Sequence, residues 1–123
     1  MKLQTTRTDG RNVFTAYGDD YVSVNAQRHD VNLIVFPDRL IERWTQASND
    51  TLASSDMAVL ASLEADILLL GTGNQIRFPS PALCQPLIRA GKGLEVMDIH
   101  AACRTYNILV GEGRYVAAAL IFS

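Results

Sequence analysis

The side chains best suited to binding a small molecule gather around one glycine turn. Gly71-Thr72-Gly73 follows an apolar run, and Asp98 follows a second apolar segment. In an open α/β sheet, ligands bind outside the carboxyl ends of parallel strands, beside helix N-termini whose free N–H groups attract anions. If the two apolar segments are parallel neighbours, both places lie on one border. We call this border the candidate rim; it predicts a site for a small anion or a partner's carboxylate, with Gly71, Thr72, Gly73, Arg77, Asp98, Arg104, Thr105 and Asn107 as its residues.

Two other interpretations of these residues stay open. The glycine turn resembles the start of a G-x-G-x-x-G dinucleotide fingerprint, but Ile76 stands where the third glycine belongs. A turn that needs a positive φ explains the two glycines more simply. Arg104 has an alternative role as well, since pairing with Asp98 or Glu95 would only tie a helix to a strand, and we favour this structural role over ligand binding.

No catalytic residue, metal site or cofactor is predicted. Ser54, Ser55 and Ser80 are placed to cap helices and lie in no G-x-S-x-G motif. The histidines have no nucleophile at a useful spacing. Cys84 and Cys103 form no CxxC motif, which favours core packing over zinc binding or a disulfide. The sequence therefore does not support an enzyme, although a ligand-binding rim would leave that question open.

Composition predicts one soluble domain. The chain has 123 residues, of which 48% are hydrophobic, and this is enough for a single core. We expect a flexible tail over residues 1–11 and one domain over residues 12–123.

Charge and hydropathy argue against two kinds of partner. Eleven basic against thirteen acidic residues argue against nucleic acid as a partner. The longest apolar run, residues 115–122, is far shorter than the roughly 20 residues of a membrane span. Residues 1–11 contain no apolar block, so we expect a cytoplasmic protein without a secretory signal.

The first half of the chain is typical of β-structure. Short runs of β-branched, aromatic and aliphatic residues are separated by turn residues such as Gly18-Asp19-Asp20 and Pro37-Asp38. They predict strands over residues 13–17, 21–24 and 31–36, and an edge strand over 39–44. Residues 45–55 are rich in Ser, Thr and Asn and predict a loop.

The second half alternates helix and strand patterns. We expect a helix over residues 56–63 capped by Ser55 and a helix over 99–112 capped by Asp98. A further helix is expected from Pro81 to about residue 90, with a kink or a premature end at Pro86. Strands are predicted over residues 65–70, 94–97 and 115–122. The nearly continuous apolar run at 65–70 indicates a strand covered on both faces, as in a parallel sheet. The order is therefore β-α-β-α-β behind a β-rich first half.

The second half also carries a string of residues that resembles a known family. The string consists of Gly71-Thr72-Gly73, Phe78-Pro79, residues 95–98, residues 102–109 (ACRTYNIL), Glu112-Gly113-Arg114 and residues 116–120. It resembles a small bacterial and archaeal domain family of unknown function whose eukaryotic relatives include mitochondrial complex I assembly factor 3, and the likeness covers roughly residues 14–122. The resemblance implies a three-layer α/β fold around a central mixed sheet, with the last strand antiparallel to the others. It further implies no established activity for the bacterial members and an assembly role for the mitochondrial ones.

These observations leave three hypotheses. The first is a noncatalytic protein-interaction or assembly-helper module with an unidentified protein partner. The second is a protein, and in one version an enzyme, that binds a small ligand or anion at the candidate rim. The third is a homo-oligomer in which an edge strand of the first half pairs with its copy.

Overall fold

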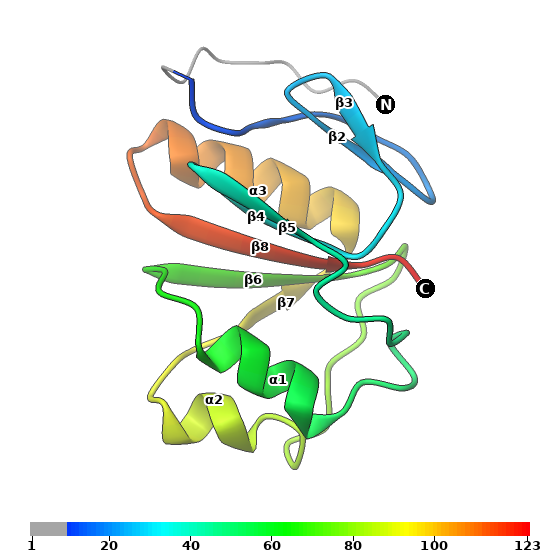
Figure 1. Ribbon diagram of the computed structural model, residues 1–123, viewed down its shortest axis with the longest axis vertical. Coiled ribbons are helices and arrows are strands. Elements are labelled where there is room, and N and C mark those ends of the chain that lie inside the picture. Colours follow the sequence, from blue (N-terminus) through cyan, green and yellow to red (C-terminus); the bar gives the residue numbers. More distant parts are fainter. Residues whose placement is uncertain (1–9) are drawn as a thin grey trace.

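The computed structural model describes residues 10–123, which form two sheets and three helices (Figure 1). The smaller sheet is antiparallel and consists of β1 (Phe14–Tyr17), β2 (Val22–Val24) and β3 (Gln27–His29). The larger sheet has the order β5 (Arg39–Glu42), β4 (Leu33–Phe36), β8 (Val116–Ile121), β6 (Ile67–Thr72) and β7 (Glu95–Met97). The expected mixed α/β architecture, with its β-α-β-α-β second half, is confirmed. Most of the predicted tail over residues 1–11 lies outside the described residues.

The helices cover opposite faces of the larger sheet. α3 (Ile99–Gly111) and the small sheet lie on one face, whereas α1 (Ser54–Ala61) and α2 (Gln85–Arg89) lie on the other (Figure 1). Side chains alternate along β8: Val116, Ala118 and Leu120 join the core under α3, and Ala117, Ala119 and Ile121 join the core under α1 and α2. A strand buried on both faces must be apolar throughout, which explains the continuous apolar runs of β6 and β8.

The direction of the last strand corrects the expectation drawn from the resemblance. β8 is parallel to β6, and β6 is parallel to β7; β8 is antiparallel only to β4. The cause is the connection through α3, which crosses the sheet from β7 to β8 and returns the chain in its original direction, as a crossover helix does.

The sequence does not predict β3, because its residues are polar and strands are recognised from apolar and β-branched runs; the strand consists of Gln27, Arg28 and His29. The turn before it, at Asn25-Ala26, has positive φ at both residues (50° and 67°). Such turns form tight hairpins and usually contain glycine, which is absent here. The sequence therefore lacked the usual signal for this hairpin.

The helix starts differ from the predictions in two of three cases. α1 is preceded by Ala53 rather than capped by Ser55, and the Asp56 carboxylate accepts a hydrogen bond from the Ala53 N–H at 2.9 Å. α2 has only five residues and starts beside Pro86, so the predicted start at Pro81 is wrong. Proline is tolerated in a first turn, whereas inside a helix its ring collides with the preceding turn. The cap of α3 is confirmed, since Asp98 Oδ1 accepts from the Ala101 N–H at 2.8 Å.

Candidate functional site

The parallel pairing of β6 and β7 brings the two halves of the predicted border together. Leu70 pairs with Val96, and Gly71 pairs with Met97. Beyond the paired residues, the Ile99 N–H donates to the Gly73 carbonyl at 2.9 Å. The glycine turn and the start of α3 therefore meet at the carboxyl ends of these strands, as expected.

Gly71 is required by packing. A Cβ atom at this position would lie 2.9 Å from Leu120 Cδ2 and 3.2 Å from both Ala102 Cβ and Ile99 Cα. These distances are shorter than carbon–carbon van der Waals contact. The glycine thus allows α3 to approach β6 closely, and Gly73, with φ at 81°, allows the turn that follows.

Thr72 organises the loop between β6 and α2. The side chain is 1% exposed, and its Oγ1 accepts from the Arg77 N–H at 2.9 Å. The same hydroxyl lies 2.8 Å from the Gln75 carbonyl oxygen and 3.3 Å from the Met97 carbonyl oxygen. A hydroxyl has one proton and two lone pairs, so these contacts occupy it. Thr72 therefore fixes the turn over residues 72–77.

The charged groups of this turn have partners within the chain. Arg77 Nη2 pairs with Asp50 Oδ1, and Asp98 caps α3. Together with Gly71, Thr72 and Gly73, these two residues form the part of the candidate rim that lies at the end of β6 and β7. Anion binding at this place stays a prediction.

Arg104 and Asn107 lie along α3 against the small sheet. Arg104 Nη1 donates to the Tyr17 hydroxyl at 3.0 Å, and among the described residues it forms no ion pair with Asp98 or Glu95. Asn107 accepts from the Phe14 N–H at 2.9 Å and donates to the Phe14 carbonyl at 2.8 Å. Thr105 is half-buried on the same helix. The structure therefore divides the candidate rim into a turn that shapes a loop and a helix that holds β1.

The histidines and Cys103 also serve packing. The His100 ring stacks on Tyr17 with 4.1 Å between centroids, and its Nε2 lies 3.1 Å from the Gly18 carbonyl oxygen. His29 ends β3, is 7% exposed, and places Nδ1 3.3 Å from Glu42 Oε1. Burial raises the pKa of the Cys103 thiol well above its ordinary value, which leaves it neutral and unreactive. Within residues 10–123, no cluster of three or more His, Cys, Asp or Glu side chains could hold a metal ion.

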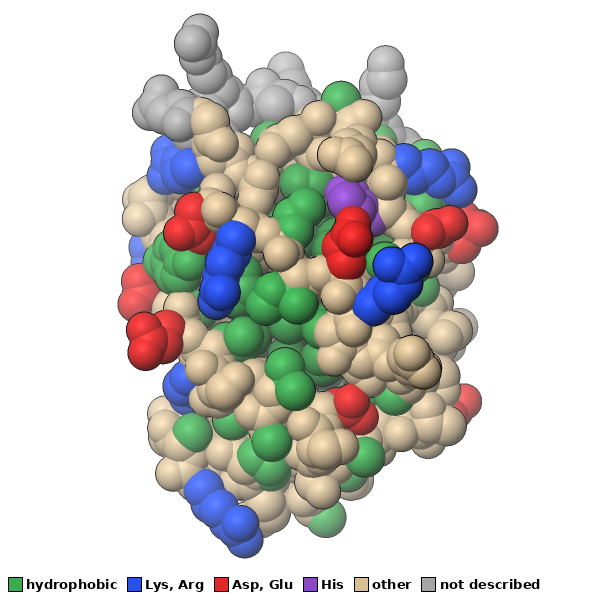
Figure 2. All heavy atoms as spheres, in the orientation of Figure 1, with side chains coloured by type: hydrophobic (Ala, Val, Ile, Leu, Met, Phe, Trp, Pro, Cys, Tyr) green, Lys and Arg blue, Asp and Glu red, His purple; other side chains and the backbone are tan. Residues whose placement is uncertain are grey.

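Exposed apolar side chains were not singled out in the sequence. Four of the five large ones in the described residues come from α1, α2 and the loop that joins β6 to α2: Val59, Ile76, Phe78 and Ile88. Phe78 is 73% exposed. The charged side chains in Figure 2 gather over the upper half of the molecule, and the lower half, over α1 and α2, is mostly apolar or uncharged. The available signal was Ile76-Arg77-Phe78-Pro79, where apolar residues stand inside a loop.

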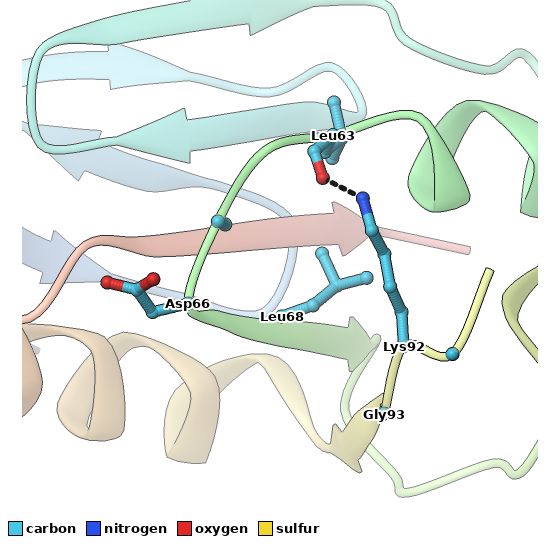
Figure 3. Close-up of a pocket in the computed structure, with 7 residues that line it drawn as sticks. Leu63, Asp66, Leu68, Lys92 and Gly93 are labelled. Carbon is cyan, nitrogen blue, oxygen red and sulfur yellow. Dashed lines mark hydrogen bonds between the residues drawn. The ribbon is translucent and has the colours of Figure 1, made fainter.

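A small cavity lies at the opposite ends of β6 and β7. It has a volume of about 180 Å³ and is formed by the turn from α1 to β6 and the turn from α2 to β7 (Figure 3). The Lys92 side chain extends along it and donates a hydrogen bond to the Leu63 carbonyl (Figure 3). This cavity could not be predicted from the sequence, because the two turns are distant along the chain.

Comparison with known proteins identifies the family. Residues 14–121 match a family described as protein of unknown function (DUF498/DUF598). The chain belongs to this family. A crystal structure of a Bordetella parapertussis protein from a structural genomics programme has 36% sequence identity and a TM-score of 0.83, and the match covers 95% of this chain and all of that one.

The relatives with descriptive names include a bacterial and a mammalian protein. The 13 kDa major membrane protein of Francisella tularensis is 25% identical over 98% of this chain and 99% of its own length. NADH dehydrogenase [ubiquinone] 1 alpha subcomplex assembly factor 3 of Mus musculus is 31% identical over 72% of this chain. The match covers 48% of that relative, so the chain spans about half of its length. Among the described residues, no helix has the length and apolar character needed to cross a membrane.

Proposed function

We propose that this protein is a noncatalytic assembly helper that binds another protein through the loop between β6 and α2. The exposure of Phe78 carries the proposal, because a partner that covered this 73% exposed phenyl ring would remove apolar surface from water, which is favourable. Ile76, two residues earlier, is 49% exposed. Aromatic side chains, phenylalanine among them, are enriched in protein interfaces.

The loop is prepared for binding by the contacts at its base. Thr72 binds the Arg77 N–H and the Gln75 carbonyl, which fixes the turn that ends directly before Phe78. A loop ordered before binding loses less entropy when a partner arrives. Arg77 is the only charged residue in the segment 72–79, and its ion pair with Asp50 balances that charge, which favours an apolar contact surface on the partner.

The family relationship supports the same function. The mouse relative is named an assembly factor for NADH dehydrogenase, and assembly factors act by contacting other proteins. We extend this to the present chain and propose subunits of a NADH dehydrogenase as its partners. The proposal includes a cytoplasmic location, with any contact to the membrane made through the partner.

The test uses tagged protein expressed in its own cells, crosslinked and purified, with bound NADH dehydrogenase subunits measured by quantitative mass spectrometry. We expect Phe78→Ser to lower their recovery at least tenfold. Ile108→Ser is the matched control, because Ile108 is a similarly exposed apolar residue on α3. Equal recovery with wild type and Phe78→Ser, or equal loss with both variants, would rule out the loop as the contact.

A further inference from the structure

The cavity beside Lys92 has the size of a small organic molecule. Its volume is about 180 Å³. An engineered apolar cavity of about 150 Å³ holds benzene, so this space accommodates roughly six non-hydrogen atoms. Its lining is mixed: Leu63, Ala65 and Leu68 form the apolar part, and Asp66, Lys92 and the backbone of the two turns form the polar part. The cavity therefore suits a small molecule with a polar end and a short apolar part.

Lys92 supplies a positive charge at this cavity. The side chain is partly buried, and its ammonium donates to the Leu63 carbonyl. An ammonium has three donors, so two remain. Within residues 10–123, Lys92 forms no ion pair with a carboxylate. In this respect it differs from Arg77, whose charge Asp50 already balances.

Gly93 leaves the cavity open, although neither packing nor backbone conformation requires a glycine at this position. A Cβ atom at Gly93 would meet no heavy atom within 4 Å, and its φ lies outside the range that favours glycine. Gly91, in contrast, has φ at 68° and needs to be glycine for its turn. Gly93 lines both this cavity and an adjoining one that contains Glu95. A side chain at Gly93 would therefore narrow the space without disturbing the fold.

The charges around the cavity select a single negative charge. Asp66 also lines the cavity, but its carboxylate is exposed and points away from Lys92 (Figure 3). Asp66 and Glu95 repel any anion, and because this repulsion grows with the charge of the ligand, a singly charged anion is less disfavoured than phosphate. A carboxylate has one charge and two acceptor oxygens, which match the free donors of Lys92.

We infer that this cavity binds a short-chain monocarboxylate. The Lys92 ammonium pairs with the carboxylate, and the alkyl chain packs against Leu63 and Leu68. This site lies apart from the Phe78 loop and does not depend on the proposed function. Lys92 also serves as a C-terminal partner for α1, and the experiment separates the two roles.

The experiment is an NMR titration of the isotope-labelled protein with sodium butyrate at constant ionic strength. Butyramide, which has the same shape without the charge, is the control ligand. We expect saturable amide shifts at residues 63–66 and 91–93 with a dissociation constant on the order of 1–10 mM, and no saturation with butyramide. Absence of saturation with butyrate, or equal responses to both ligands, would overturn the inference.

Two variants test the residues. Lys92→Met keeps the length of the side chain and removes the charge, and we expect it to abolish saturation. Gly93→Val should weaken butyrate binding at least tenfold, whereas Gly111→Val, at another glycine whose added Cβ meets no neighbour, should leave binding unchanged. If Lys92→Met does not fold, the comparison of Gly93→Val with Gly111→Val still tests whether butyrate binds in this cavity. Undiminished binding in Gly93→Val, or in a folded Lys92→Met, would show that Lys92 acts only as a structural partner of α1.

Discussion

The two faces of the larger sheet differ in how their side chains are used. On the face covered by α3, polar groups join the helix to the first strand: Asn107 binds both backbone groups of Phe14, and the Tyr106 hydroxyl donates to the Asn12 carbonyl at 3.0 Å. On the other face, α1 and α2 are short, and Val59 and Ile88 remain exposed.

The difference between the two faces indicates on which side of the larger sheet a partner or ligand binds. Polar residues that look functional in the sequence, such as Arg104 and Asn107, are engaged in holding the α3 face together. The α1–α2 side has four of the five large exposed apolar side chains among the described residues, the fifth being Ile108 on α3. It also has a lysine whose ammonium is not paired with a carboxylate among the described residues. Both of our proposals therefore involve the α1–α2 side of the sheet, and the following predictions test whether the contrast holds.

The largest expected contrast concerns the two cysteines. Cys103 is fully buried on the inner side of α3, and Cys84 is half-buried at the start of α2. A buried thiol reacts only after unfolding, so Cys84 should react with a thiol reagent at least about a thousandfold faster. The measurement is the time course of Ellman's reagent in native buffer. In concentrated guanidinium both should react alike; similar native rates would show that the α3 face opens readily.

The next contrast concerns two glycines. Gly71→Val forces atoms against Leu120, Ala102 and Ile99, and we expect a loss of about 3 kcal/mol in the free energy of unfolding. Gly93→Val, with no neighbour to displace, should change it by less than about 0.5 kcal/mol. Urea unfolding compares the two. A tolerated Gly71→Val would mean that α3 can move away from β6.

Asn107→Ala should lower the free energy of unfolding by about 1–3 kcal/mol. The substitution leaves the Phe14 N–H and carbonyl without their partner in a partly buried place. Lys92→Met, on the other face, should change it by at most about 1 kcal/mol, because its neutral stem still packs. Both free energies are measured by urea unfolding. If Asn107→Ala and Lys92→Met lost similar amounts, the proposed difference between the two faces would be contradicted.

The α3 face should also make stability fall at alkaline pH. Burial raises the pKa of the Cys103 thiol above its ordinary value of 9.0, so the native thiol stays protonated when the unfolded one ionises. Stability is therefore complete below pH 9.0 and decreases above it, by about 1.4 kcal/mol per pH unit. Burial likewise raises the pKa of Tyr106, which adds to the fall above 10.0. Urea unfolding between pH 8 and 11 measures the slope, and Cys103→Ala should reduce it.

The smallest expected effect is that of Phe78→Ser on stability. The ring is 73% exposed, so its removal should change the free energy of unfolding by less than about 0.5 kcal/mol, as should Ile108→Ser. Thermal unfolding measures both. A large loss from Phe78→Ser would indicate that the ring supports the fold, and the proposed contact with a partner would then lose its basis.

Local chemistry explains which elements could be predicted. The apolar run at β6 and the Asp98 cap followed from patterns within a few residues. The parallel pairing of β6 with β7 was the condition on which the candidate rim depended, and the structure confirms it. β3 did not follow, because the Asn25-Ala26 turn lacks the usual glycine, and the length of α2 did not follow, because Pro86 lies in the first turn of the helix and not in its interior. The direction of β8 depended on the path of α3 across the sheet.

The sequence by itself determined the alternation of strands and helices, the apolar interior and the family, because these depend on neighbouring residues and on patterns that repeat along the chain. Only the tertiary structure decided the partners of the polar side chains. Arg77 meets Asp50, Arg104 meets Tyr17, and Lys92 crosses to Leu63, each over a long separation in the chain. A long side chain pairs with whatever the fold brings within a few ångströms of it, and that proximity arises only when the whole sheet has assembled.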